Sequence, residues 1–256
     1  MEISSADFFD KVRPYKAIIP PYTYEEVSEF YYKNTIPRSA TLPPWSGRVQ
    51  IESKLIKPRL VCTIACWIER INERNLSFKR KYKFDLLYRS SRDGIDTGTF
   101  RSNCNDQGQC LVLVKQKSST KIYGGYNPIS FTQVYNNYGY NYNYNNAQWR
   151  ATTESFIFSF EDSGRDAKIS RVNSNNRGSA IYENNYNGFD FGNTFYMSGQ
   201  NIYFSYTGYY EDNVIDSNMN TNFTPEEIEV FKITISWFAD SIYICVHKRI
   251  VYVHIF

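Results

Sequence analysis

The feature that most restricts the fold is a series of short β-prone runs that follow one another from Phe84 onward. They are rich in β-branched and aromatic residues, and turn-forming Gly, Asn, Asp or Ser separates most of them from the next. The predicted strands are 110–117, 121–126, 155–160, 167–172, 179–183 and 201–206. Together with one helix-like stretch near TGTFRSNC, this spacing predicts an α+β fold in which two mainly antiparallel sheets pack as a sandwich with a few helices.

The chain before these strands has a different pattern and holds most of the nine prolines. Thr23 and Glu26 form a capping-box pattern that predicts the start of a short helix. Residues 37–45 (PRSATLPPW) interrupt any regular structure and are predicted to be a linker. We therefore expect a helical or extended N-terminal segment over residues 1–76.

A second helix is predicted within this segment, in the run PRLVCTIACWIERINER. Pro58 suits its first turn, where a missing N–H group costs nothing. Its apolar residues recur at three- and four-residue steps and form one stripe: Leu60, Ile64, Trp67 and Ile71. The following FKRKYK is predicted to be a basic junction between this helix and the strands.

Two segments depart from both patterns. Between residues 135 and 146, eleven of twelve residues are Tyr or Asn, which predicts an inserted loop; a prion-like or ligand-stacking role is the alternative. The tail, residues 236–256, is apolar but is interrupted by Asp240 and by the run His247-Lys248-Arg249. A membrane span needs about 18 nearly uncharged residues, so we expect a terminal strand pair or a partly disordered tail, with only indirect membrane contact.

Charge and cysteine content indicate the cellular setting. Lys and Arg number 29 and Asp and Glu number 26, and a net charge of +3 gives no basic surface for nucleic acid. The five cysteines are an odd number, and the N-terminus (MEISSADFFDKVRPYK) has no apolar signal region. We expect a reduced, cytoplasmic protein.

Acid–base and nucleophilic chemistry lack their usual residues. The only histidines, His247 and His254, lie in the last ten residues, so a Ser-His-Asp or Cys-His site has no base in the strand-rich region. The sequence holds neither a P-loop nor a GxGxxG motif. Gly124 and Gly125 are instead predicted to relieve crowding or to form a bulge. We predict no catalytic residue and no cofactor.

The cysteines favour core packing over metal binding. Cys62 and Cys66 lie four residues apart on the predicted helix, but a zinc site needs four ligands, so burial is predicted for both and for Cys110. No metal ligand is assigned. Cys104 is the one redox candidate, because the neighbouring Arg101 would lower the pKa of its thiol.

Two turn regions are candidates for partner binding. Arg92-Asp93-Gly94 predicts a tight turn with Gly94 at positive φ, and Arg89 and Arg92 are placed to reach carboxylates or main-chain carbonyls. The alternative to a purely structural turn is a rim that contacts a partner. The second region is a predicted loop from Asn187 to Gly192, with candidate residues Gly188, Phe189 and Phe191. Its two phenylalanines are expected to plug the end of the sandwich, and partner contact is the alternative.

A family resemblance covers residues 84–233. The stretch FDLLYRSSRDGIDTGTFRSNCNDQGQCLVLVKQKSSTKIYGGYNPI resembles the opening of a TLDc domain (TBC, LysM-associated domain, catalytic). WRATTESFIFSF, DAKISRV, SAIYENNYNGFDFG, NIYFSYTGYY and FTPEEIEVFKI continue the resemblance in the same order. Residues 11–76 resemble the segment that joins a BTB–BACK region to the TLDc domain in fungal relatives, so we expect a protein of the fungal BTB–TLDc type without its BTB half.

The resemblance implies an N-terminal segment over 1–76, a TLDc domain over 77–235 and a divergent tail. It also implies a sandwich with helices at its edges, a role in resistance to oxidative stress and binding to the vacuolar proton-pumping ATPase. No agreed reaction belongs to the family. We therefore expect a non-enzymatic protein-interaction module. The alternatives are a redox or hydrolytic enzyme, and an adaptor fragment whose helix at Pro58 docks onto another protein or onto a second copy.

Overall fold

The computed structural model describes Ser28 and residues 49–71, 80–132, 147–161, 164, 166–211, 214, 221–237, 242–246 and 249–253. The chain divides into two units, Met1–Ser46 and Gly47–Phe256, and every element described below belongs to the second. Of the predicted helix at Thr23 only Ser28 is described, and it is helical. The linker and the Tyr/Asn-rich segment lie outside the described residues.

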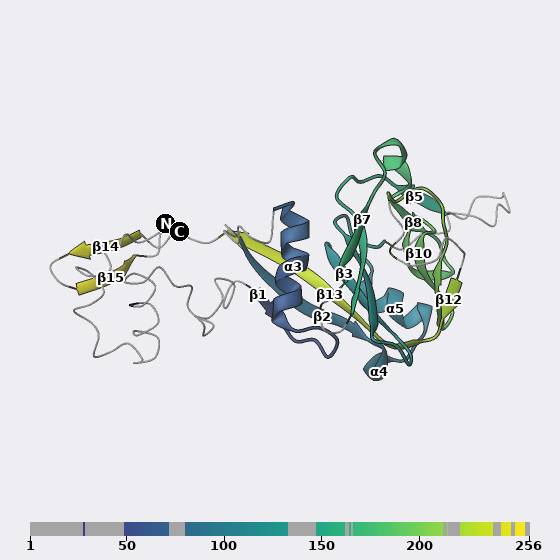
Figure 1. The fold of residues 1–256 in the computed structure, drawn as a ribbon, viewed down its shortest axis with the longest axis horizontal. Helices are drawn as coiled ribbons and strands as arrows, with labels where there is room; N and C mark the ends of the chain where they lie inside the picture. Colours follow the sequence, from purple (N-terminus) through teal and green to yellow (C-terminus); the bar gives the residue numbers. More distant parts are fainter. Residues whose placement is uncertain are drawn as a thin grey trace. The chain divides into compact units, whose positions relative to one another are not determined.

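The larger sheet has seven strands in the order β1-β2-β13-β3-β4-β6-β7 (Figure 1). Their bounds are β1 Val49–Ile51, β2 Arg80–Arg89, β13 Pro225–Trp237, β3 Cys110–Gln116, β4 Lys121–Asn127, β6 Phe156–Glu161 and β7 Lys168–Arg171. Neighbouring strands are antiparallel, except that β1 pairs parallel to β2. The long strand β13 comes from near the end of the chain but lies between β2 and β3. The larger sheet therefore joins segments that are far apart in the sequence.

The second sheet has four antiparallel strands in the order β12-β11-β10-β9. Their bounds are β12 Thr221–Phe223, β11 Asn201–Phe204, β10 Phe195–Ser198 and β9 Asn187–Phe191. Two smaller pairs complete the strands: β5 Gln148–Arg150 with β8 Ile181–Glu183, and β14 Ile242–Val246 with β15 Arg249–Val253. The last pair confirms a terminal strand pair in the tail. The 3₁₀ helix η3 spans Ser174–Ser179.

The core lies between the two large sheets and is rich in aromatic rings. Side chains from alternate positions of the larger sheet, such as Val112 and Val114, meet rings of the smaller sheet. Phe195 and Phe204 stack with ring centroids 4.7 Å apart, and Tyr123 of β4 contacts Phe204 at 4.9 Å. Offset and edge contacts of this kind stabilise aromatic cores beyond their buried area. The predicted α+β sandwich is confirmed.

The predicted second helix is α3, Pro58–Glu69, with Pro58 in its first turn. It covers one face of the larger sheet (Figure 1), where the Trp67 ring contacts Phe156 at 6.1 Å and Phe158 at 5.4 Å between centroids. Ile64 is fully buried. The apolar stripe therefore packs on the sheet of its own chain. None of the helices in the described part of the chain is long and apolar enough to cross a membrane.

Two of the predicted connections are wrong. The basic junction is the start of β2, in which the buried rings of Tyr82 and Phe84 alternate with the exposed Lys83. Successive side chains of a strand point to opposite faces, so one face can be buried even where the other face carries charged residues. The predicted loop from Asn187 is strand β9, which pairs with β10 at Asn187, Asp190 and Phe191. The rings of Phe189 and Phe191 are buried in the core.

Candidate functional site

The Arg92-Asp93-Gly94 region forms a short helix and a turn directly after β2. Helix α4, Ser90–Asp93, follows Arg89, and the N–H of Gly94 donates to the carbonyl of Ser90 at 2.9 Å. Gly94 has a φ of 86°, as predicted, a conformation that only glycine adopts without strain. The hydroxyl of Tyr88 donates to the Gly94 carbonyl and holds the turn from below.

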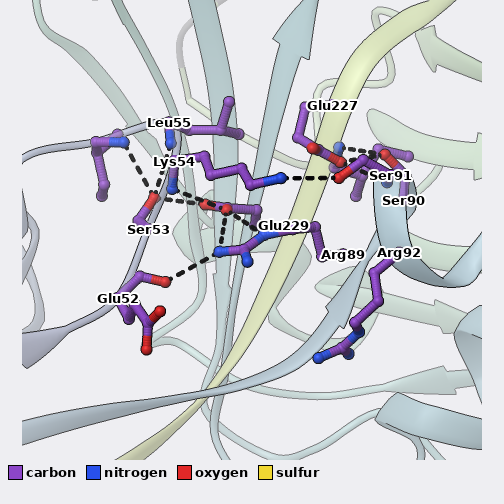
Figure 2. A network of polar contacts seen from close by, with 12 residues as sticks. Glu52, Ser53, Lys54, Leu55, Arg89, Ser90, Ser91, Arg92, Glu227 and Glu229 are labelled. Carbon is purple, nitrogen blue, oxygen red and sulfur yellow. Dashed lines mark hydrogen bonds and ion pairs between the residues drawn. The ribbon is translucent and has the colours of Figure 1, made fainter.

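Glu229 of β13 lies at the centre of a polar network beneath this turn (Figure 2). The side chain of Glu229 is fully buried, and the Arg89 guanidinium pairs with it through Nε and Nη2, each 2.8 Å from Oε1. The backbone N–H of Lys54 donates to the same oxygen at 2.9 Å, and the Ser53 hydroxyl donates to Oε2. A buried carboxylate is stable only with such a set of donors.

The same network fixes the loop between β1 and α3. Arg89 Nη2 donates to the carbonyl of Glu52 at 3.1 Å (Figure 2). The Ser53 oxygen accepts from the backbone N–H groups of Leu55 and Ile56, both at 3.0 Å. Residues about 175 positions before β13 are thus tied to it through one carboxylate.

Glu227, two residues earlier on β13, holds α4 in the same way. Its Oε1 accepts from the Ser90 hydroxyl at 2.6 Å and from the Ser91 N–H at 2.8 Å, while the Ile228 N–H donates to the Ser90 oxygen at 2.9 Å. Burial alone would raise the pKa of Glu227, but the hydrogen bonds from Ser90 and Ser91 outweigh burial and keep that pKa below its usual range. The carboxylate is therefore charged at neutral pH, and its Oε1 is held by two donors of α4.

Arg92 and Asp93 lie at the surface of the turn. Arg92 donates to both oxygens of Asp93, at 2.7 and 2.8 Å, and to the carbonyl of Leu87 at 3.0 Å. Asp93 also accepts from the N–H of Arg89 at 2.9 Å. The Arg92 hydrogen bonds are the largest cause that lowers the pKa of Asp93. About half of the Arg92 side chain remains exposed. The hydrogen bonds to Asp93 therefore hold Arg92 in place while part of its side chain stays accessible to solvent.

We call Ser91, Arg92, Asp93 and Gly94 the α4 rim. Ser91, Arg92 and Gly94 are exposed, and the carboxylates below them are already engaged by donors of the chain itself. No group of His, Cys, Asp and Glu in the described ranges could hold a metal ion. The arrangement supplies an exposed turn that is held rigidly on the sandwich.

The other predicted partner-binding residues are not part of this rim. The rings of Phe189 and Phe191 are fully buried in the core cluster, which corrects the alternative of partner contact, because a buried ring offers no surface to a partner. Gly188 packs closely as well, since a Cβ at this position would lie 2.9 Å from the Met197 sulfur and 3.3 Å from the Phe100 ring.

The premise for redox chemistry at Cys104 is wrong. Cys104 is fully buried at the end of α5, Thr97–Cys104, and burial is the main cause that raises the pKa of its thiol far above the ordinary value. Arg101 instead points its guanidinium at the carbonyl of Asn184, at 3.1 Å. Cys62, Cys66 and Cys110 are buried, as predicted.

We expect Cys104 to react with a maleimide no faster than Cys62 or Cys66 in the folded protein, because all three thiols are buried and only the thiolate is nucleophilic. Labelling followed by peptide mass spectrometry measures the three rates, with the urea-unfolded chain as the control in which all react. Faster labelling of Cys104 than of the other two would restore the redox hypothesis.

Glu227 and Glu229 were not predicted as site residues from the sequence. The available signal was the alternation in PEEIEVFKI, where two glutamates at alternate positions share one face of a strand whose other face, Ile228 and Val230, is apolar. Buried charge on such a face requires partners. Those partners, Arg89 and Ser53, lie 140 and 176 residues away, and no local pattern identifies them.

The fold and the rim define a class of protein: an α+β domain of two packed antiparallel sheets that presents a rigid turn beside its central strand. A comparison with protein-family models gives a match to the TLDc domain over residues 49–234. The chain belongs to the TLDc domain family. The match includes β1 and α3, which the sequence analysis placed before the domain. A comparison with curated proteins gives no match.

Proposed function

We propose that this protein acts as a non-enzymatic interaction module of the TLDc type and that the α4 rim contacts the partner. The observation that carries the proposal is the pair of buried carboxylates under the rim. Glu227 and Glu229 accept hydrogen bonds that hold the turn and the neighbouring β1–α3 loop in place. A rigid, exposed turn loses little conformational entropy on binding, which favours recognition.

The charges of the rim suit a polar contact with another protein. The exposed Arg92 still has guanidinium donors facing solvent, and Lys54 donates to the exposed Ser91 hydroxyl at 3.3 Å. Arginine is enriched in the parts of interfaces that carry most of the binding energy. From the family resemblance we propose the vacuolar proton-pumping ATPase as the partner, protection against oxidative stress as the cellular role and the cytoplasm as the location.

The two alternatives have less support. An enzyme needs a free acid, base or nucleophile. The burial of Cys104 and the hydrogen bonds of the carboxylates beneath the rim, Glu227 and Glu229, argue against these groups serving as one. An adaptor that docks through the helix at Pro58 needs an exposed apolar stripe, whereas Trp67 packs on Phe156 and Phe158.

A binding measurement with the purified pump tests the proposal. We expect the double variant Arg92→Ala/Asp93→Ala to bind at least about tenfold more weakly than the wild type, because it removes the fixed charged pair at the centre of the rim. The matched control is Arg177→Ala/Glu154→Ala, which removes one exposed charge in η3 and one just before β6, at the other end of the sheet. We expect its affinity to equal that of the wild type.

Thermal melting of both variants shows whether each is folded. The Asp93 carboxylate supports the N–H of Arg89, so a loss of about 1 kcal/mol is expected for the rim variant. If the rim variant is folded and binds as tightly as the wild type, the α4 rim is not part of the interface.

A further inference from the structure

A cluster of partly exposed aromatic rings lies on the pair β5–β8, in a part of the molecule that the proposed function does not use. Trp149 of β5 is 42% exposed. Tyr182 of β8 lies directly opposite Trp149 in the pairing, and the centroids of the two rings are 4.5 Å apart. The Tyr209 ring, from the connection that follows β11, contacts the Trp149 ring at 5.4 Å. We call Trp149, Tyr182 and Tyr209 the aromatic cluster.

The backbone beneath the aromatic cluster is held in place. On the opposite face of β8, Ile181 is fully buried, and the Glu183 carboxylate pairs with Arg150 of β5 at 3.4 Å. The Asn173 N–H donates to the carbonyl of Tyr209 at 2.8 Å. Rings on a fixed backbone lose little conformational entropy when they bind a partner, and Trp and Tyr are enriched among the residues that carry most of the binding energy in interfaces.

The aromatic cluster also carries hydrogen-bond donors that the chain does not use. Within the described residues, the indole N–H of Trp149 and the hydroxyls of Tyr182 and Tyr209 make no hydrogen bond. An indole N–H can only donate, and a phenol hydroxyl can donate as well as accept. The three rings with their donors therefore suit a ligand that combines apolar surface with carbonyl acceptors.

The charges around the aromatic cluster balance. Arg150 pairs with Glu183, which is 5% exposed. Just after β5, the Thr152 N–H donates to the carbonyl of Arg177 at 3.2 Å, and the Thr152 hydroxyl accepts from the N–H of Glu154 at 3.1 Å. The exposed Arg177 and Glu154 therefore add one positive and one negative charge. Neither a cation nor a nucleic acid gains from this balance, which favours an uncharged ligand.

We propose that the aromatic cluster is a second binding site and that it takes an uncharged, proline-rich peptide segment in the polyproline II conformation. Proline rings supply the apolar surface that packs on Trp and Tyr. The backbone of such a segment has no internal hydrogen bonds and no N–H at its prolines, so its carbonyls are available to the donors of the cluster. The site is separate from the α4 rim.

NMR titration of the full chain with synthetic decaproline tests the proposal. We expect the signals of the Trp149 indole N–H and of the amides of residues 148–150 and 181–183 to shift, while the amides of the α4 rim stay unchanged. A glycine–serine peptide of the same length lacks the proline rings and should shift none of these signals. The vacuolar pump takes no part in the experiment, so its outcome is independent of the test of the rim.

Two variants separate the contribution of the rings from that of the donors. Trp149→Ala should weaken decaproline binding at least about tenfold, because it removes the central ring. Tyr182→Phe/Tyr209→Phe keeps both rings and removes two donors, so a loss of about fivefold is expected. The control is Tyr186→Ala, which removes a ring that is 62% exposed but outside the cluster and should bind as the wild type does.

Three results would overturn the proposal. One is a Trp149 indole signal that does not move at millimolar decaproline. Another is wild-type affinity in Trp149→Ala when thermal melting shows that the variant is folded; if it is not folded, wild-type affinity in the double Phe variant decides in the same way. The third is binding of oligouridylate or of choline to the same signals at lower concentrations than decaproline, which would assign the cluster to nucleic acid or to a cation.

Discussion

Replacing Glu229 with Ala is expected to lower the free energy of unfolding by about 3–5 kcal/mol, the largest single-residue effect that we predict outside the aromatic core. The change leaves Arg89, whose side chain is only 13% exposed, without its carboxylate, and it removes the acceptor for the Lys54 N–H and the Ser53 hydroxyl. Urea denaturation followed by circular dichroism measures the loss.

Glu226 provides the matched control for this variant. It lies on the same strand, is exposed, and its replacement by Ala should change stability by no more than about 0.5 kcal/mol. Glu229→Gln keeps the size of the side chain and should fall between the two. A Glu229→Ala variant as stable as Glu226→Ala would show that the network beneath the rim does not fix it.

The second large effect is expected at Gly124, where Ala should destabilise the fold by about 3 kcal/mol. A Cβ on Gly124 would lie 2.3 Å from the Phe158 ring and 2.6 Å from the Val112 carbonyl oxygen. The ring is held in place by Trp67, and the carbonyl belongs to the β3–β4 pairing, so neither neighbour is free to move. Thermal or urea unfolding of the variant tests this prediction.

Gly178→Ala is the control for Gly124→Ala. No atom lies within 4 Å of a Cβ at Gly178, and its φ is not positive, so the change should be neutral or slightly stabilising. Equal stability of the two variants would contradict the crowding that the sequence already led us to expect at Gly124 and Gly125.

Elements that depend on interactions between residues close together in the sequence were predicted from the sequence. Helix α3 follows from Pro58 and one apolar stripe, and α5 begins where Asp96 caps it by accepting from the Thr99 N–H at 2.7 Å. Most of the short strands lie within a few residues of their predicted bounds, because each is a run rich in β-branched and aromatic residues that is bounded by turn residues.

The predictions failed where distant segments decide the structure. The start of β2 was predicted to be a junction because it is rich in Lys and Arg. It is a strand because it pairs with β13, which lies about 150 positions further along the chain. The expectation for Cys104 rested on one neighbouring arginine, whereas burial by the surrounding core determines the state of its thiol. The α4 turn was predicted, but its anchors on β13 were not, since only the assembled sheet brings Glu227 and Glu229 to Ser90 and Arg89.

The most direct test of the interaction module is a footprint of the bound partner. Hydrogen exchange of the chain alone and with the purified vacuolar pump should show slower exchange on binding for amides of residues 90–98 and of the neighbouring β1–α3 loop. Slower exchange confined to another surface, or none anywhere on the chain at saturating pump, would contradict our account.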